Sequence, residues 1–251
     1  AAYELEPSWF SLGDLDLATH LVRTQMLEAG FALSQITEAL CARWLASDPR
    51  LHLVPMSDDR VETHVVIADP AEPSGRRAVH FQEYWVRLHA APDALEVLLV
   101  GADEATLTPG LRATIAAADL ILVAPSNPVV SIGPILAVAE LRAALVAAPA
   151  PVIGFAGILG GAPVLGMAHR LLPSIGIEVD AAAVGLHYGA RSTGGVLDTW
   201  VMDSADAHSV AAIEAAGLHG VATDLLMHDS EATGKFIRLA VETGVRRSDP
   251  A

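Results

Sequence analysis

The sequence is short of cysteine. Its 251 residues contain only one, Cys41. A single thiol excludes a disulfide framework and a cysteine-rich zinc site, because both need several cysteines. A cytoplasmic location fits this composition, since proteins of reducing compartments seldom use disulfides.

Positively charged residues are also scarce. The chain has 15 Lys and Arg residues against 30 Asp and Glu residues, and its formal net charge is -15. Such a surface repels phosphate backbones and anionic lipids, so we expect neither nucleic acid nor a membrane as a partner. No apolar run reaches the length of about 18 residues that indicates a membrane-spanning helix.

Several catalytic motifs are missing. The sequence contains no Gly-x-x-x-x-Gly-Lys-Ser/Thr, no Gly-x-Ser-x-Gly and no His-Glu-x-x-His. Classical kinases, serine hydrolases and zincins therefore lose their usual support. Gly157, Gly160 and Gly161 lack the Gly-x-Gly-x-x-Gly spacing, so we do not interpret them as a dinucleotide fingerprint.

What the sequence has is a large apolar share and a regular alternation of strand and helix patterns. Hydrophobic residues make up 52% of the chain. The alternation predicts an α/β, Rossmann-like fold with a mostly parallel sheet and helices on both faces. Expected strands cover residues 62–68, 95–100, 120–124, 152–156, 199–202 and 220–223. Expected helices cover residues 17–28, 35–45, 109–118, 134–147 and 230–243.

The domain prediction is one α/β domain over residues 1–251, with a small helical insert left open around 155–195. Residues 120–124 form an uninterrupted apolar run, which is typical of a central parallel strand covered on both faces. The sequence does not begin with an initiator Met, and we expect further sequence upstream of Ala1.

The strongest candidate for a binding loop follows that apolar run. Residues 124–128 read Ala-Pro-Ser-Asn-Pro. In open parallel sheets, ligands bind at the carboxyl ends of the strands, which is where Ser126 and Asn127 are expected. A stiff loop followed by a helix start at Pro134 suits a phosphate or a nucleotide. An ordinary strand-to-helix turn has the same composition, so both interpretations stay open.

Weaker candidates lie before and after this loop. Asp14, Asp16 and His20 fall within about two helical turns and suit a metal ion or a proton transfer, although Asp16 alone is also a good helix cap. Asp58 and Asp59 suit either a solvated turn or a polar substrate group. Residues 80–85 contain two adjacent aromatics, Tyr84 and Trp85, that suit either a ring-stacking platform or the core. Residues 187–191 are more typical of a surface turn.

Four of these blocks occur in a fixed order: Asp-Leu-Asp-Leu-Ala-Thr-His at 14–20, Pro-Met-Ser-Asp-Asp at 55–59, His-Phe-Gln-Glu-Tyr-Trp-Val at 80–86 and Ala-Pro-Ser-Asn-Pro-Val-Val-Ser-Ile-Gly-Pro at 124–134. Together they resemble the 2-phospho-L-lactate transferases of coenzyme F-420 biosynthesis, in particular the actinobacterial branch. Each block is weak alone, and the order over nearly the whole chain is specific.

The resemblance implies a reaction. The donor is a guanosine diphosphate diester of lactate or, in actinobacteria, of enolpyruvate. The terminal hydroxyl of the deazaflavin Fo attacks the phosphorus that carries this group, and GMP leaves. The resemblance also implies a Mg²⁺ requirement and a homodimer. The competing hypothesis is a non-catalytic regulatory protein of the same fold that binds nucleotide sugars.

The site residues are carried over by position in these blocks. The resemblance implies catalytic roles for Asp14, Asp16 and His20. It implies donor binding by Ser126, Asn127, Ser131 and Gly133. It implies acceptor binding by the following residues: Thr19, Ser57, Asp58, Asp59, Thr63, Glu83 and Trp85.

The chain departs from the family pattern in two places. The family's Gly-rich turn and its Asn-x-x-Asp-Asp block are not present, and we expect the metal ligands upstream of Ala1. The family also has Arg or Lys where this chain has Leu15, and an apolar side chain cannot donate a hydrogen bond. Arg23 and Arg191 are candidates to replace that basic residue.

Overall fold

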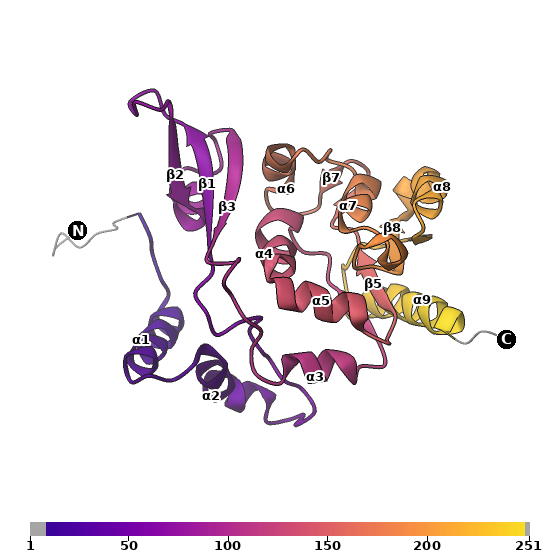
Figure 1. The fold of residues 1–251 in the computed structure, drawn as a ribbon, viewed down its shortest axis with the longest axis horizontal. Helices are drawn as coiled ribbons and strands as arrows, with labels where there is room; N and C mark the ends of the chain where they lie inside the picture. Colours follow the sequence, from indigo (N-terminus) through magenta and orange to yellow (C-terminus); the bar gives the residue numbers. More distant parts are fainter. Residues whose placement is uncertain (1–8, 249–251) are drawn as a thin grey trace.

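The structure is a computed structural model that describes residues 9–248. Its first half contains two helices and an antiparallel sheet of order β2-β1-β3, which stand on the left of Figure 1. In β1, Val65 and Ile67 belong to the main apolar core, two residues apart as in a strand, and Val66 between them is also buried. The elements of this half are α1 (Asp14–Glu28), α2 (Leu33–Leu45), β1 (Glu62–Ala68), β2 (Arg76–His80) and β3 (Ala94–Val100).

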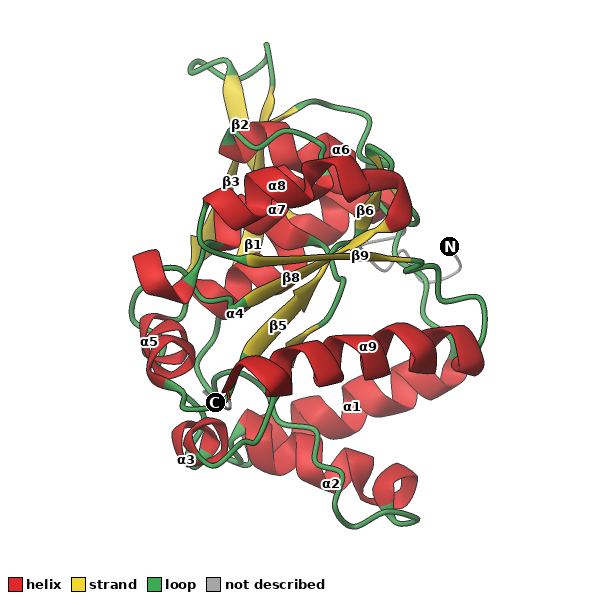
Figure 2. Ribbon diagram, turned by 90° about the vertical axis from the view of Figure 1, so that its right-hand side faces the viewer, coloured by secondary structure: helices red, strands yellow, loops and turns green. Residues whose placement is uncertain are grey.

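The second half is built on a parallel sheet of order β4-β5-β8-β9. Its strands are β4 (Ile121–Val123), β5 (Val152–Phe155), β8 (Thr199–Asp203) and β9 (His219–Thr223). Every residue of β5 is buried, as is typical of a parallel strand covered on both faces. The helices are α3 (Leu111–Ala116), α4 (Gly133–Ala137), α5 (Ala139–Ala147), α7 (Ala181–Tyr188), α8 (Val210–Ala215) and α9 (Ser230–Ser248). Figure 2 shows α9 beside β5, which it contacts.

The stretch between β5 and β8 departs from simple alternation. It begins with a two-stranded hairpin of β6 (Ile158–Leu159) and β7 (Ala162–Pro163). The short helix α6 (Ala168–Leu171) follows, and a 3-10 turn continues it before α7. The sequence allowed a small helical insert around residues 155–195, and these elements lie in that stretch. In Figure 1, α6 lies between the antiparallel sheet and the parallel half.

One apolar core joins the two sheets. Val65 and Tyr84 of the antiparallel half belong to the same buried cluster as Ile153 and Trp200 of the parallel half. The Trp200 indole is fully buried, and its Nε1 donates a hydrogen bond to the Ala181 carbonyl at 2.9 Å. The antiparallel sheet is therefore packed against the parallel half.

The α/β class and the parallel sheet are confirmed, and several local predictions are wrong. Asp16 does not cap α1, because the helix begins at Asp14 after Gly13. The predicted helix over 134–147 is two helices, which break at Val138 with a bend of 83°. Residues 78–87, whose sequence fits either a strand or a helix, complete β2 and then form the π-helical turn η1 (Glu83–Arg87).

The prediction of a central position for residues 120–124 is also wrong. Within the described residues, β4 stands at one end of the parallel sheet and pairs only with β5. Leu122 is 41% exposed as a result. An apolar run indicates that a strand carries no polar side chains. It does not indicate how many strands pair with it.

Candidate functional site

The loop after β4 is held by its own polar groups. The Ser126 amide donates to the Ala124 carbonyl at 2.8 Å, which turns the chain sharply and leaves the Ser126 side chain exposed. Asn127 then begins the π-helical turn η2 (Pro128–Ile132). Its Oδ1 accepts hydrogen bonds from the Val129 amide at 2.9 Å and the Val130 amide at 3.3 Å. The loop is therefore preorganised by a cap and by two prolines.

Ser131 and Gly133 lie in and directly after η2, behind the loop. The Ser131 amide donates to the Asn127 carbonyl at 3.1 Å. A Cβ atom on Gly133 would lie 2.8 Å from the Pro128 carbonyl oxygen, so the tight turn leaves no room for a side chain. The contacts of these two residues support the shape of the loop, and their part in donor binding stays a prediction.

A pocket opens beside this loop at the carboxyl ends of β4 and β5. Its volume is about 220 Å³. Its side chains are apolar, and Phe155 and Phe236 of the lining meet edge to face with ring centroids 5.5 Å apart. The lining consists of Pro125, Phe155, Ala156, Gly157, Leu159, Val164, Leu165, Leu225, Leu226, Met227 and Phe236. Apolar walls of this kind suit the faces of a planar ring.

Gly157 joins the pocket to the loop. A Cβ atom at this position would lie 3.0 Å from the Pro125 carbonyl oxygen and 3.8 Å from that of Ser126. The loops after β4 and β5 therefore touch at a point where only glycine fits without displacement. The spacing of Gly157 from the next glycines matches no dinucleotide fingerprint. The signal that it carries in the sequence is its place directly after a buried strand.

The block on α1 lies on an exposed helix. Asp14 and Asp16 are exposed, and the Thr19 hydroxyl donates back to the Leu15 carbonyl at 3.0 Å. Nδ1 of His20 lies 2.7 Å from a guanidinium nitrogen of Arg23. α1 packs against α2, and it makes no hydrogen bond to the Ser126–Asn127 loop in the described part of the chain.

The block at 55–59 has structural partners. Asp58 accepts hydrogen bonds from the Ser34 amide at 2.6 Å and its hydroxyl at 3.0 Å, and so caps the start of α2. Asp59 accepts from the amide and the hydroxyl of Thr106, both at 2.8 Å. These hydrogen bonds, the backbone one first, hold the pKa of Asp59 below its usual value.

The remaining members of this group are also placed by the fold. Ser57 is buried, and its hydroxyl lies 3.4 Å from the Asp59 carboxylate. Thr63 lies in β1 opposite Leu99 of β3. The contacts of Asp58 and Asp59 join the 55–63 region to the start of α2 and to Thr106. Acceptor binding by these residues stays a prediction.

The aromatic block divides into a buried and an exposed part. Tyr84 is fully buried and its hydroxyl donates to the Pro92 carbonyl at 3.0 Å, while burial raises the pKa of its phenol. Trp85, the next residue, is 42% exposed. Tyr84 thus belongs to the core, and Trp85 offers a face on which a planar ring can stack.

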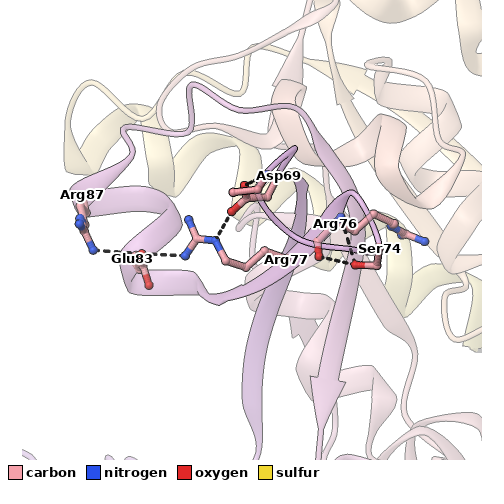
Figure 3. Close-up of polar contacts among 7 residues, drawn as sticks. Asp69, Ser74, Arg76, Arg77, Glu83 and Arg87 are labelled. Atoms are coloured by element: carbon pink, nitrogen blue, oxygen red, sulfur yellow. Dashed lines mark hydrogen bonds and ion pairs between the residues drawn. The ribbon is translucent and has the colours of Figure 1, made fainter.

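Glu83 is held in a chain of ion pairs (Figure 3). Its Oε1 lies 3.4 Å from Nη1 of Arg77 and 3.3 Å from Nη1 of Arg87. Arg77 also pairs with Asp69 at 3.0 Å. The carboxylate therefore ties η1 to β2, and any ligand group would share it with two arginines.

Arg191 does not lie where a replacement for the missing basic residue would be needed. Its Nε donates to Asp198 at 2.9 Å and its Nη1 donates to the Ala148 carbonyl at 2.6 Å. Asp198 in turn accepts from the amide of Val152, the first residue of β5. This places Arg191 at the amino end of the parallel strands, opposite the pocket. Arg23, which lies on α1 with Leu15, remains the candidate.

The described residues contain no group of three or more His, Cys, Asp or Glu side chains that fits a metal ion. The aspartates of α1 and those of the 55–59 block are held by separate partners, as described above. These residues therefore do not fit a Mg²⁺ site by themselves, and the predicted Mg²⁺ requirement stays untested.

Comparison with known proteins decides the family. The family model described as 2-phospho-L-lactate transferase CofD matches residues 3–239. The chain belongs to this family. The four ordered blocks therefore indicated the right family, and the chain is a transferase of the CofD type.

Actinobacterial relatives carry the name phosphoenolpyruvate transferase. The protein of Kitasatospora aureofaciens is 58% identical over 239 residues, which are 95% of this chain and 71% of the relative. That of Streptomyces coelicolor is 52% identical over 241 residues, 96% of this chain and 72% of the relative. That of Nocardia farcinica is 50% identical over 242 residues, 96% and 70% respectively. These names favour the transferase over the regulatory hypothesis.

Solved structures support the fold. Protein BH3568 of Bacillus halodurans superposes with a TM-score of 0.58 at 15% identity, covering 95% of this chain and 79% of that chain. A second structure of the same protein, described as a member of the upf0052 family, gives a TM-score of 0.55 at 16% identity over 90% of this chain and 74% of that chain. At such identities the likeness concerns the fold alone.

Within residues 9–248, no single helix has the length and apolar character to cross a membrane. The bent pair formed by residues 128–137 and 139–147 meets the criteria of length and composition when taken together. Much of that pair packs in the core, where Val129, Ile132 and Leu141 are buried.

Proposed function

We propose that this transferase moves a phosphoenolpyruvyl group from a guanosine diphosphate-linked donor to the terminal hydroxyl of the deazaflavin Fo, with release of GMP. The observation that carries the proposal is the name shared by its relatives, phosphoenolpyruvate transferase, at 50% to 58% identity over almost the whole chain. The acceptor and the leaving group follow from the family resemblance of the four blocks.

The reaction is a single displacement at phosphorus. The acceptor oxygen forms a bond to the phosphorus that carries the enolpyruvyl group, and the bond from that phosphorus to the GMP oxygen breaks. The hydroxyl proton leaves to a base or to solvent, and GMP departs with the bonding electron pair. Such a transfer depends chiefly on positioning and on electrostatic stabilisation of the moving charge.

In this proposal the donor binds at the carboxyl end of β4. The exposed Ser126 hydroxyl and the Asn127 amide nitrogen donate to phosphate oxygens. The guanine ring enters the neighbouring apolar pocket, whose lining includes the exposed side chains of Leu226 and Met227. Gly157 supports this arrangement, because it lets the loop and the pocket wall approach each other.

The acceptor side rests on the exposed residues of the family blocks. Trp85 stacks on the deazaflavin ring, and Asp14, Asp16 and His20 on α1 serve its hydroxyl and the proton transfer. Mg²⁺ would neutralise phosphate charge when bound, and the described residues do not fit such a site by themselves. A homodimer in the cytoplasm completes the proposal.

The test is an assay of the purified full-length protein with Fo, Mg²⁺ and either the enolpyruvyl or the lactyl donor. Chromatography measures GMP and the phosphorylated deazaflavin. We expect both products, with kcat/KM for the enolpyruvyl donor at least about tenfold higher, a typical margin for small differences in a substrate group. Equal rates with the lactyl donor would overturn the donor assignment, and release of neither product would overturn the proposed reaction.

A further inference from the structure

Arg170 of α6, in the parallel half, forms hydrogen bonds to the turn at residues 89–93 of the antiparallel half. Its Nε donates to the Ala90 carbonyl at 3.2 Å. Its Nη2 donates to the Ala91 carbonyl at 2.8 Å and lies 3.0 Å from the Asp93 carboxylate. All three contacts fall on a segment almost 80 positions earlier in the chain. A planar guanidinium is suited to such a fork of acceptors.

The turn that Arg170 holds has an unusual backbone. His89 and Ala90 have φ angles of 50° and 51°, and they are the only non-glycine residues with positive φ in the part of the chain that the structure describes. Side chains disfavour this region, so such conformations persist only where the surroundings impose them. Ala90 is buried, and its amide donates to the Tyr84 carbonyl at 2.9 Å.

The turn and the aromatic block form one unit. The turn follows η1 directly, and the Leu88 amide donates to the Glu83 carbonyl at 3.0 Å. The Tyr84 hydroxyl donates to the Pro92 carbonyl beyond the turn. Trp85 lies within this closed segment, so a shift of the turn moves the indole.

α6 also contacts elements that adjoin the donor loop. These are η2, which begins directly after Asn127, and β7 of the hairpin. The hairpin continues into Val164 and Leu165, which line the pocket. α6 therefore contacts both the structures around the donor loop and, through Arg170, the aromatic unit.

We propose that Arg170 is a positioning residue, which sets the place of the Trp85 segment relative to the Asn127 loop and so brings acceptor and donor together. The inference rests on the proposed function in one respect, namely that the Trp85 segment contacts the acceptor. Arg170 itself contacts backbone carbonyls, Asp93 and the Tyr84 phenol, and none of these is a reacting atom.

The first test compares Arg170→Met and Arg170→Lys with the matched control Arg76→Met. Arg76 pairs with Glu96 inside the antiparallel half at 2.9 Å, so its loss leaves the α6 contact intact. We expect Arg170→Met to raise the acceptor KM about tenfold, as the loss of charged hydrogen bonds predicts, with donor KM within about twofold of wild type. Arg170→Lys should fall between, because one ammonium cannot reproduce the fork.

A second-site variant separates positioning from general stability. Glycine adopts positive φ without penalty, so Ala90→Gly should restore part of the acceptor KM in the Arg170→Met background. Equal changes in donor and acceptor KM, or no change in either, would overturn the inference. So would a double variant no better than Arg170→Met alone.

Hydrogen exchange keeps the inference testable if the wild-type chain transfers nothing to Fo, which would overturn the proposed function alone. Amides of residues 83–93 should then exchange faster in Arg170→Met than in wild type or Arg76→Met, and exchange over the Asn127 loop should change less. Unchanged exchange over residues 83–93 would overturn the role of Arg170 independently of any substrate.

Discussion

At the scale of single residues, the oxygen and the nitrogen of the Asn127 side-chain amide have different roles. Its oxygen is committed to the start of η2, where it accepts two backbone hydrogen bonds. Within the described residues its amide nitrogen has no such internal partner in the hydrogen-bond network. Because the nitrogen only donates, it suits an acceptor such as a phosphate oxygen.

Substitutions at Asn127 should separate these two roles. Asn127→Asp keeps the capping oxygen but loses the donor and adds a negative charge, so GDP affinity should fall while the melting temperature stays within about 1 °C. Asn127→Ala also loses the cap, which costs about 1 kcal/mol and lowers the melting temperature by about 2–4 °C in a protein of this size. Calorimetric titration and thermal unfolding measure both, and unchanged GDP affinity in Asn127→Asp would contradict the donor role.

Asp59 shows how a residue chosen for binding can serve the fold. Its carboxylate accepts two hydrogen bonds from Thr106, and its pKa is held below the usual value. A carboxylate with a lowered folded pKa contributes stability that is present above the unfolded pKa. That contribution is lost as the pH falls through the folded pKa.

The pH dependence of stability should therefore change in Asp59→Asn. The variant should melt below wild type at neutral pH, and the gap should close as the pH falls from the unfolded value of about 3.9 through the lower folded value. Melting curves from pH 7 to pH 3 measure the gap. A gap that is constant over this range would show that the Thr106 contacts do not depend on the charge of Asp59.

At the scale of elements, the site depends on how closely the loops after β4 and β5 approach. The Gly157 backbone lies against the Pro125 carbonyl, and both residues line the pocket. The neighbouring strands are parallel, so their carboxyl ends meet at one edge and bring these loops together. The shape of the pocket is thus a property of the strand pair.

Gly157→Ala should disturb this contact. The added methyl group would sit 3.0 Å from the Pro125 oxygen, so the loop must move by a few tenths of an ångström. We expect GDP binding to weaken by about threefold to tenfold, in line with the cost of small geometric shifts at binding sites. Gly234→Ala is the matched control, because its neighbour is the flexible end of Arg238 in α9. Equal GDP affinity in the two variants would contradict the prediction.

At the scale of the whole molecule, the chain has two sheets and one continuous core. Val65 and Tyr84 share this core with Ile153 and Trp200. The segment before β1 is also joined to the segment after β3, since Thr106 binds Asp59 and the Thr108 hydroxyl donates to the Pro55 carbonyl at 2.7 Å. Residues of both sheets are buried in one cluster.

The two sheets should therefore unfold together. We expect a single thermal transition, with the calorimetric enthalpy equal to the van't Hoff enthalpy. Scanning calorimetry measures the enthalpies, and tryptophan fluorescence gives a second probe. Two separate transitions would contradict the prediction of one domain over residues 1–251.

Much of the secondary structure could be predicted because it depends on neighbours in the sequence. The β-branched run of residues 62–68 became β1 with the predicted bounds, and the apolar run after Pro151 became β5. One wrong prediction is local, since Asp16 looked like a cap and α1 begins two residues earlier. The central position expected for residues 120–124 depends on strand neighbours that such a window does not contain, and β4 lies at one end of the sheet.

The candidate site was predicted in part. The Ser126–Asn127 loop lies at the carboxyl edge of a parallel strand, as the general rule for such sheets requires. The pocket beside it was missed, because Phe155, Leu225 and Phe236 come from three separate segments. Each is an ordinary apolar residue in its own stretch of sequence, and only their meeting makes a cavity.

The sequence by itself determined the alternation of strands and helices, the family through its four ordered blocks, and the loop that ends β4. Each of these depends on residue order within a short window. The tertiary structure decided that Asp58 caps α2, that Arg191 faces the amino edge of the sheet and that Arg170 holds a strained turn. Those roles join residues from 7 to 80 positions apart. Their partners are chosen by the folded path of the chain, because a charged side chain binds whichever acceptor the fold brings within reach.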